Sequence, residues 1–249
     1  MTVALVTNDD GIDSAGLHRL ALLASDAGLE VTIAAPAAQS SGSSASITGA
    51  ATDGRIRFER RELEGLEGIP AYAVQAAPAL IALIAAHGAF GPVPDLVLSG
   101  INRGANVGRA ILHSGTVGAA LTGGVNGARG LAVSLDVGMH PEEFHWDAAT
   151  PFVLQLLSRL QETPTGTVFN LNVPNHNGPD PELREGSLAA FGIVQTTMTR
   201  NDEEHTRLSV ADTPAGQEPG SDAALLAAGF ATVTSIASIS EAAEAALQA

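Results

Sequence analysis

Short apolar runs alternate with helical patterns over the first two-thirds of the chain. Nearly continuous apolar stretches predict strands that are buried on both faces. These strands are expected at 3–8, 30–36, 94–102, 130–136 and 167–174. Apolar residues at helical spacing predict the helices between them, at 15–28, 78–88, 147–162 and from about Ser114 onward. Strands that alternate with helices in this way are typical of an α/β fold with a doubly wound, mostly parallel sheet.

The sequence changes character from residue 175. The chain becomes polar and rich in proline and glycine, which predicts an extended excursion and not a second core. A short helix and a closing strand are expected within 222–236, and a terminal helix at 240–249. We therefore expect a single α/β domain over residues 1–249. Its parts are the core in 1–174, the excursion in 175–221 and the closing elements in 222–249.

Composition narrows the possible partners. The chain has 249 residues, of which 45% are hydrophobic, enough for one sizeable core. Its formal net charge of −15 argues against nucleic acid and against anionic membranes as partners. An anionic substrate remains compatible with this charge, because a bound divalent cation inverts the local field of a site.

Missing residue types exclude several chemistries. The chain has no cysteine, which excludes disulfides and thiolate metal sites. All of its 12 basic residues are arginines, which excludes lysine Schiff bases and a Walker-type lysine. Neither a signal peptide nor an apolar run of about 18–20 residues is present. We therefore expect a soluble, cytoplasmic protein.

Oxygen-bearing side chains follow three of the predicted strands. The first strand ends in Asp9 and Asp10, the second leads into the serine pair 40–41, and the third carries Ser99 and Asn102. Ligands bind beyond the carboxyl ends of parallel strands, so these side chains are expected to meet at one edge of the sheet. Carboxylate, hydroxyl and amide oxygens are hard ligands suited to Mg²⁺, Mn²⁺ or Ca²⁺. A divalent cation also cancels the repulsion between the two adjacent aspartates.

A second group of residues predicts an anion site. Ser114, Gly115 and Thr116 open a helix with free backbone N–H groups, hydroxyls and the positive end of the helix dipole. Asn106 precedes them in the same connection and offers an amide donor. A cation that faces a phosphate-binding helix start implies metal-assisted phosphoryl chemistry. Taken singly, each motif has an ordinary explanation as a turn, a helix cap or a surface loop, so the interpretation depends on their combination.

Four segments together resemble a known family. They are VTNDDGIDSAGL, VTIAAPAAQSSGSSASIT, DLVLSGINRGANVGRAILHSGTVGAALTGG and LNVPN, and their order and spacing are similar to the SurE (survival protein E) family. The resemblance is dense over about residues 1–136 and sparse afterwards. It implies a Rossmann-like α/β fold flanked by helices, with a C-terminal hairpin that builds homodimers or homotetramers. It also implies a metal-dependent 5′-nucleotidase, a hydrolase that also acts on 3′-nucleotides.

The resemblance also implies roles for single residues. It places one divalent cation per subunit, Mn²⁺ or Mg²⁺ with Ca²⁺ as a substitute, on Asp9, Asp10, Ser41 and Asn102. It assigns the phosphate to Asn106, Ser114, Gly115 and Thr116. The choice of Ser41 over Ser40 depends on the family pattern alone. Asp9 and Asp10 are the candidate catalytic residues, with Asp9 preferred for positioning or deprotonating the attacking water. Attack by an aspartate to give an aspartyl-phosphate is the less favoured route, because both carboxylates are committed to the metal.

Three segments depart from the family pattern. The charged residues that usually precede the serine loop are replaced by AAQS, a GTP.DC segment is replaced by QAAPAL, and the closing strand ends in TSI where TPL is usual. The first two lie near the expected substrate entrance. Hydrolysis of nucleoside monophosphates is the preferred function. The alternatives are an exopolyphosphatase for short polyphosphate and a nucleotide-binding module without turnover.

Overall fold

A nine-stranded mixed sheet forms the centre of the described part of the chain. The computed structural model describes residues 1–40, 42–49, 54–138, 141–190, 196–201, 206–210, 218–237 and 239. The strands lie in the order β3-β4-β2-β1-β5-β6-β7-β11-β8. They are β1 Val3–Thr7, β2 Glu30–Pro36, β3 Phe58–Arg61, β4 Ala71–Val74, β5 Leu96–Arg103, β6 Arg129–Asp136, β7 Val168–Pro174, β8 Leu183–Glu185 and β11 Ala231–Ile236.

Most neighbouring strands run parallel. The exceptions in this sheet are β3 against β4 and β7 against β11. The chain builds outward from β1 through β2 to β4, and then returns to the other side of β1 with β5. The order therefore reverses between β1 and β5, where a doubly wound sheet opens a crevice at its carboxyl edge.

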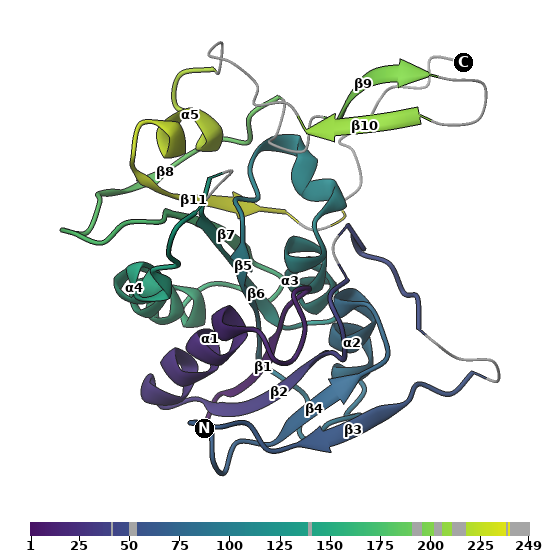
Figure 1. The fold of residues 1–249 in the computed structure, drawn as a ribbon. Coiled ribbons are helices and arrows are strands. Elements are labelled where there is room, and N and C mark those ends of the chain that lie inside the picture. Colours follow the sequence, from purple (N-terminus) through teal and green to yellow (C-terminus); the bar gives the residue numbers. More distant parts are fainter. Residues whose placement is uncertain are drawn as a thin grey trace, which may run out of the picture.

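Helices cover both faces of the sheet, as Figure 1 shows. They are α1 Ala15–Asp26, α2 Pro78–Ala85, α3 Gly115–Val125, α4 Thr150–Gln161 and α5 Asp222–Ala227, with short 3₁₀ helices η1 Gly108–His113 and η2 Trp146–Ala149. α1 and α4 pack on one face, and α2 and α3 on the other. Strand β1 illustrates the alternation that this requires, because Ala4 and Val6 join the first cluster and Leu5 the second.

The close fit of α1 to the sheet depends on a glycine. A Cβ at Gly16 would lie 2.1 Å from the carbonyl oxygen of Ile101 and 3.0 Å from the Trp146 ring. Only a residue without a side chain allows this approach of helix to strand. The packing brings the start of α1, which directly follows the aspartate pair, against the end of β5.

The α/β fold with a mostly parallel sheet is confirmed. The predicted helix at 147–162 begins as the 3₁₀ turn η2 and becomes α-helical only from Thr150, where Pro151 occupies the first turn of α4. Proline fits a first turn because its missing N–H would be unpaired there in any case.

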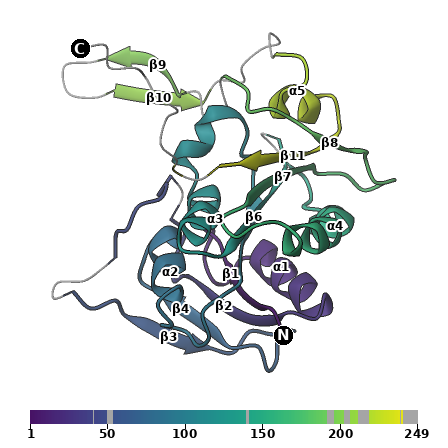
Figure 2. The same ribbon diagram turned by 180° about the vertical axis from the view of Figure 1, so that it is seen from behind.

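A two-stranded antiparallel hairpin lies within the predicted excursion. It consists of β9 Thr196–Asn201 and β10 Thr206–Val210, and Figure 2 shows it projecting from the main body at the end opposite β3. Strand β8, from the same excursion, instead returns to the edge of the main sheet beside β11. The terminal helix predicted at 240–249 lies outside the described residues. Within the part of the chain that is described, no helix has the length and apolar character needed to cross a membrane.

Candidate metal and phosphate site

The turn after β1 is shaped by the buried side chain of Asn8. Its Oδ1 accepts the Gly11 N–H at 3.1 Å, and its Nδ2 donates to the Gly11 carbonyl at 3.1 Å and to Ser14 Oγ at 2.7 Å. Gly11 has a φ of +103°, a conformation that glycine adopts without strain. Asn8 thus fixes the turn that presents Asp9 and Asp10 at the carboxyl edge of the sheet.

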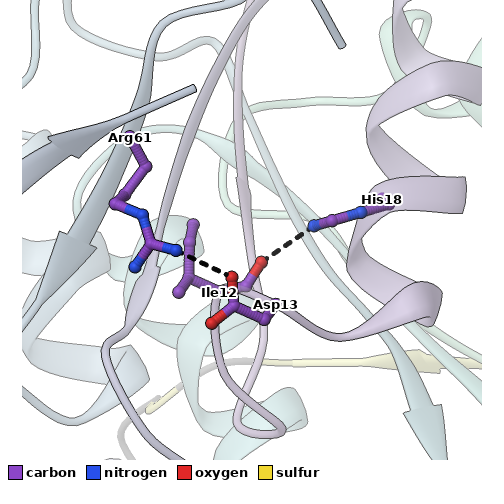
Figure 3. Close-up of polar contacts among 4 residues, drawn as sticks. All are labelled: Ile12, Asp13, His18 and Arg61. Atoms are coloured by element: carbon purple, nitrogen blue, oxygen red, sulfur yellow. Dashed lines mark hydrogen bonds and ion pairs between the residues drawn. The ribbon is translucent and has the colours of Figure 1, made fainter. Parts of the chain in front are cut away.

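Two further contacts hold the part of this loop that leads toward α1, at Ile12 and Asp13, as Figure 3 shows. His18 on α1 lies with its Nε2 3.0 Å from the carbonyl oxygen of Ile12, so that nitrogen donates. Arg61 on β3 forms an ion pair with Asp13 at 3.2 Å. The loop is therefore attached on one side to a helix and on the other to a strand.

Asp9 lies where three elements meet. Its side chain is 6% exposed, and its Oδ1 accepts a hydrogen bond of 2.6 Å from the hydroxyl of Thr116 on α3. Its backbone carbonyl accepts the N–H of Ser40, just beyond β2, at 2.7 Å. A Cβ at Gly115 would lie 2.9 Å from Asp9 Oδ2. The structure therefore brings the ends of β1 and β2 against the first turn of α3.

Asp10 lies against the end of β5. Its Oδ2 accepts the backbone N–H of Arg103 at 3.2 Å. The neighbouring Asn102 uses its Nδ2 to donate to the Gly104 carbonyl at 2.8 Å, which leaves the amide oxygen as the atom for a cation. The β5–β6 pairing shifts register between Ser99 and Asn102, and such irregularities re-aim side chains at strand ends.

In the protein alone, the cost of burying the two negatively charged aspartates is only partly offset by favourable contacts. Burial raises the pKa of the Asp9 carboxyl, the hydrogen bond from Thr116 opposes this, and the nearby charge of Asp10 adds to the increase. Burial also raises the pKa of Asp10, against the lowering effect of the Arg103 N–H and guanidinium. Two adjacent desolvated carboxylates with an amide oxygen beside them fit a hard divalent cation, which supplies the positive charge that this site lacks.

We expect Asp9→Asn to raise the free energy of unfolding of the metal-free protein at neutral pH. A carboxyl whose pKa is higher in the folded than in the unfolded protein contributes its full stabilisation only below its ordinary pKa of 3.8. It is lost as the pH rises through the raised folded value. Asparagine carries no charge and still accepts the bond from Thr116. Urea unfolding in EDTA at about pH 4 and about pH 8 measures the difference. A gain of equal size at both pH values would contradict the explanation.

The first turn of α3 forms the predicted phosphate cradle. Ser114 caps the helix, since its Oγ accepts the Val117 N–H at 3.1 Å and its carbonyl accepts the Gly118 N–H at 2.9 Å. Its hydroxyl therefore stabilises the helix start. The N–H of Gly115 remains as the anion donor of this turn, whereas the N–H of Thr116 interacts with Asp9 and lowers the pKa of that carboxyl.

Gly115→Ala is expected to disturb this junction and to lower the free energy of unfolding by about 1–3 kcal/mol. The added Cβ would lie 2.6 Å from Ser43 Oγ and 2.9 Å from Asp9 Oδ2, so one of the two neighbours must move. Chemical denaturation measures the loss. Gly178→Ala is the matched control, because a Cβ there meets no atom within 4 Å. Equal stability of the two variants would show that α3 does not press against Asp9.

Asn106 lies over β6 and β7, held by buried polar residues. Asn172 accepts its N–H at 2.7 Å, and both Asn170 and Asn172 donate to its carbonyl, at 2.8 and 2.9 Å. Its own Nδ2 donates to Ser134 Oγ at 2.9 Å. The three partners are fully buried. Among the described residues, no direct hydrogen bond joins Asn106 to either aspartate.

The three residues that hold Asn106, which are Ser134, Asn170 and Asn172, are not among the site residues predicted from the sequence. In register, Asn102 of β5 lies beside Ser134 of β6, which lies beside Asn172 of β7. A polar row therefore crosses the carboxyl edge of the sheet. The signal was present in the sequence, because Asn170 and Asn172 interrupt an otherwise apolar strand at alternate positions.

The structure brings most of the predicted residues together in two groups, and one predicted residue lies outside the described part of the chain. Asp9, Gly115 and Thr116 are in direct contact, and Asp10 contacts the backbone that follows Asn102. Ser41, the remaining predicted metal ligand, lies outside the described residues. The described residues contain no cluster of three or more His, Cys, Asp or Glu side chains able to hold a metal. A site here therefore needs the neutral oxygen ligands as well.

Comparisons with known proteins identify the family of this chain. The Survival protein SurE family model matches residues 4–204. Proteins named 5′-nucleotidase SurE from Stenotrophomonas maltophilia (strain K279a) and Xanthomonas euvesicatoria pv. vesicatoria are 35% and 37% identical over 173 residues, or 69% of this chain. The match spans 63% of the length of each relative. The crystal structure of SurE from Aquifex aeolicus superposes with a TM-score of 0.72 at 24% identity, covering 94% of this chain and 93% of that one, and supports the fold. This chain belongs to the SurE family.

Proposed function

We propose that this protein is a metal-dependent phosphomonoester hydrolase that converts nucleoside 5′-monophosphates to nucleoside and phosphate. The observation that carries this proposal is the contact between the buried Asp9 and the first turn of α3. It sets two adjacent carboxylates, whose chemistry suits a divalent cation, beside a helix start whose N–H chemistry suits phosphate. The relatives' name, 5′-nucleotidase SurE, supports nucleoside monophosphates as the substrate class.

Different residues are proposed to hold the cation and to orient the phosphate. Asp9, Asp10, Asn102 and Ser41 would hold one divalent cation, Mn²⁺ or Mg²⁺. When bound, the cation polarises a phosphoryl oxygen and neutralises the charge that develops on it. The N–H of Gly115 orients the phosphate from the other side, while Thr116 holds Asp9.

Asn106 is proposed to add an amide contact to the phosphate. Its backbone is fixed by Asn170 and Asn172, and one hydrogen of its Nδ2 is donated to Ser134 Oγ, so the second Nδ2 hydrogen is the donor that it can offer to a phosphate oxygen. A contact made by a residue held on three sides costs little conformational freedom. Asn106 is thus a preorganised, peripheral member of the site.

Asp9 is proposed to orient and deprotonate the attacking water. The Thr116 hydroxyl fixes its orientation through Oδ1, which holds the carboxylate in place to accept a proton from the water. Direct attack by an aspartate would leave a phosphoenzyme. Trapping one with a fluoride–metal phosphate analogue would replace this mechanism with the covalent one.

One assay tests the function. Purified protein is incubated with each common nucleoside 5′- and 3′-monophosphate and with short polyphosphate, in Mn²⁺, Mg²⁺ or EDTA, and released phosphate is measured. We expect release from nucleoside 5′-monophosphates that requires metal. Release from polyphosphate alone would identify an exopolyphosphatase. Nucleotide binding without any release would identify a binding module.

We further propose that the protein forms a homodimer or homotetramer, with the β9–β10 hairpin contributing to the contact. The hairpin stands apart from the main sheet, and an isolated two-stranded hairpin is at best marginally stable in water. Packing against another subunit would stabilise such a hairpin. Light scattering coupled to gel filtration measures the mass, and a monomer at all concentrations would contradict the proposal.

A further inference from the structure

Aromatic side chains gather on one side of the candidate site, in the segment between β6 and α4. The rings of Phe144 and Trp146 stack with centroids 5.5 Å apart and an angle of 13° between their planes. Phe144 is 37% exposed, whereas Trp146 is half-buried against Gly16 at the start of α1. Trp146 thus supports a ring that faces solvent.

One arginine connects this platform to the aspartates. The backbone N–H of Arg103 bonds Asp10 Oδ2 at 3.2 Å, and its guanidinium carbon lies 5.9 Å from the centre of the Phe144 ring. Arg103 therefore lies between Asp10 and the platform. In a nucleotide, the ribose likewise lies between the phosphate and the base.

A cavity of about 610 Å³ opens beside the platform. Phe144, Trp146, His145 and His176 are among the residues that line it. This volume falls within the range typical of small-molecule sites. Both ring nitrogens of His176 are buried and have no hydrogen-bond partner among the described residues. Buried polar atoms without a partner carry a free-energy cost that a ligand can remove.

We propose that the Phe144–Trp146 platform, together with Arg103, binds the base of the nucleotide substrate. Phe144 stacks on the base, and the Arg103 guanidinium packs and donates hydrogen bonds at its edge. His176 then lies in the cavity wall beside the bound base. The inference rests on the proposed function, because it takes the phosphate to lie at Asp9 and Asp10.

A second cavity adjoins the aspartates on the opposite side, and its chemistry fits a base less well. It has about 800 Å³ and is lined by the loop from Pro36 to Gly49 and by residues 74–77. Its described lining residues are small, aliphatic or amide side chains without an aromatic ring. Stacking supplies much of the affinity for a base, and only the first cavity offers it.

The first test compares two substrates that differ only in the base. Adenosine 5′-monophosphate and ribose 5-phosphate are hydrolysed in parallel by the wild type and by Phe144→Leu, which keeps apolar bulk and removes the ring. We expect KM for the nucleotide to rise about tenfold with little change in kcat, because a stacked base is held equally before and during reaction. Hydrolysis of ribose 5-phosphate should not change.

Phe58→Leu is the matched control. Phe58 is 46% exposed and contacts the rings of Tyr72 and Phe90 on the β3 edge of the sheet. Its replacement should leave KM for both substrates unchanged. Two results would overturn the proposal: an unchanged KM for the nucleotide in Phe144→Leu, or an equal loss with ribose 5-phosphate, which would show damage unrelated to the base.

The second test needs no turnover. Trp146 is the single tryptophan of the chain, so its fluorescence reports on the platform alone. In EDTA, adenosine 5′-monophosphate should quench this fluorescence saturably, ribose 5-phosphate should not, and Phe144→Leu should weaken the nucleotide's binding. If the wild type hydrolyses no nucleotide, the proposed function fails and this titration alone decides the base site. Absence of saturable quenching by the nucleotide would then refute it.

Discussion

Replacing Asp9 or Asp10 by asparagine is expected to lower kcat/KM for nucleotide hydrolysis by more than about 100-fold. Partners that only orient metal ligands are worth about 10–100-fold, and the loss of a ligand itself should exceed that. Both side chains are near-isosteric with asparagine, so the bond from Thr116 to residue 9 can survive and the fold is retained. The effect therefore reports the charge and not the shape of the site.

Steady-state kinetics over a series of Mn²⁺ concentrations measures this loss. Asp26→Asn is the control, because Asp26 is an exposed residue at the far end of α1. It removes one negative charge from the same segment and should leave kcat/KM unchanged. Activity within a few-fold of the wild type in either Asp9→Asn or Asp10→Asn would remove that residue from the proposed site.

Exhaustive chelation should abolish hydrolysis, and addition of Mn²⁺ or Mg²⁺ should restore it. Burial raises the pKa of both carboxyls, and a bound cation would offset the cost of keeping them charged there. A cation that binds the folded state also stabilises it, by about 2.7 kcal/mol at a concentration of 100 Kd. Phosphate release and thermal unfolding are therefore expected to respond together.

A paired measurement makes the assignment specific. The metal-dependent increase in Tm should appear in the wild type and in Asp26→Asn, and it should be lost or strongly reduced in Asp10→Asn. Full hydrolysis after chelation would refute the metal assignment. A Tm increase of the same size in Asp10→Asn would place the cation elsewhere in the molecule.

Much of the fold was predictable because its signals are local. The strands β1, β2, β5, β6 and β7 coincide closely with apolar runs, and the helix at α3 begins where Ser114 provides a cap. A cap, a glycine stop or a buried strand is specified within a few residues. The short 3₁₀ helices η1 and η2 were not predicted, because such turns carry weak sequence signals.

The candidate site was predictable to the extent that its residues are clustered in the chain. Asp9 and Asp10 adjoin one strand, and Ser114, Gly115 and Thr116 open one helix, so their residue types alone indicated metal and phosphate chemistry. Their assigned roles remain predictions to be tested by the variants above. Asn170, Asn172 and Ser134 were missed, since a buried asparagine has no meaning until the register shows which backbone it supports.

The sequence by itself determined the order of strands and helices and the chemical character of the NDDG and SGT segments. Only the tertiary structure decided which segments meet. Thr116 contacts Asp9 across 107 positions of the chain, and Arg103 connects Asp10 to the ring of Phe144. Such contacts depend on sheet order, on strand register and on close approaches such as that of Gly115. These are properties of the whole packed chain, and local patterns of apolar and polar residues do not encode them.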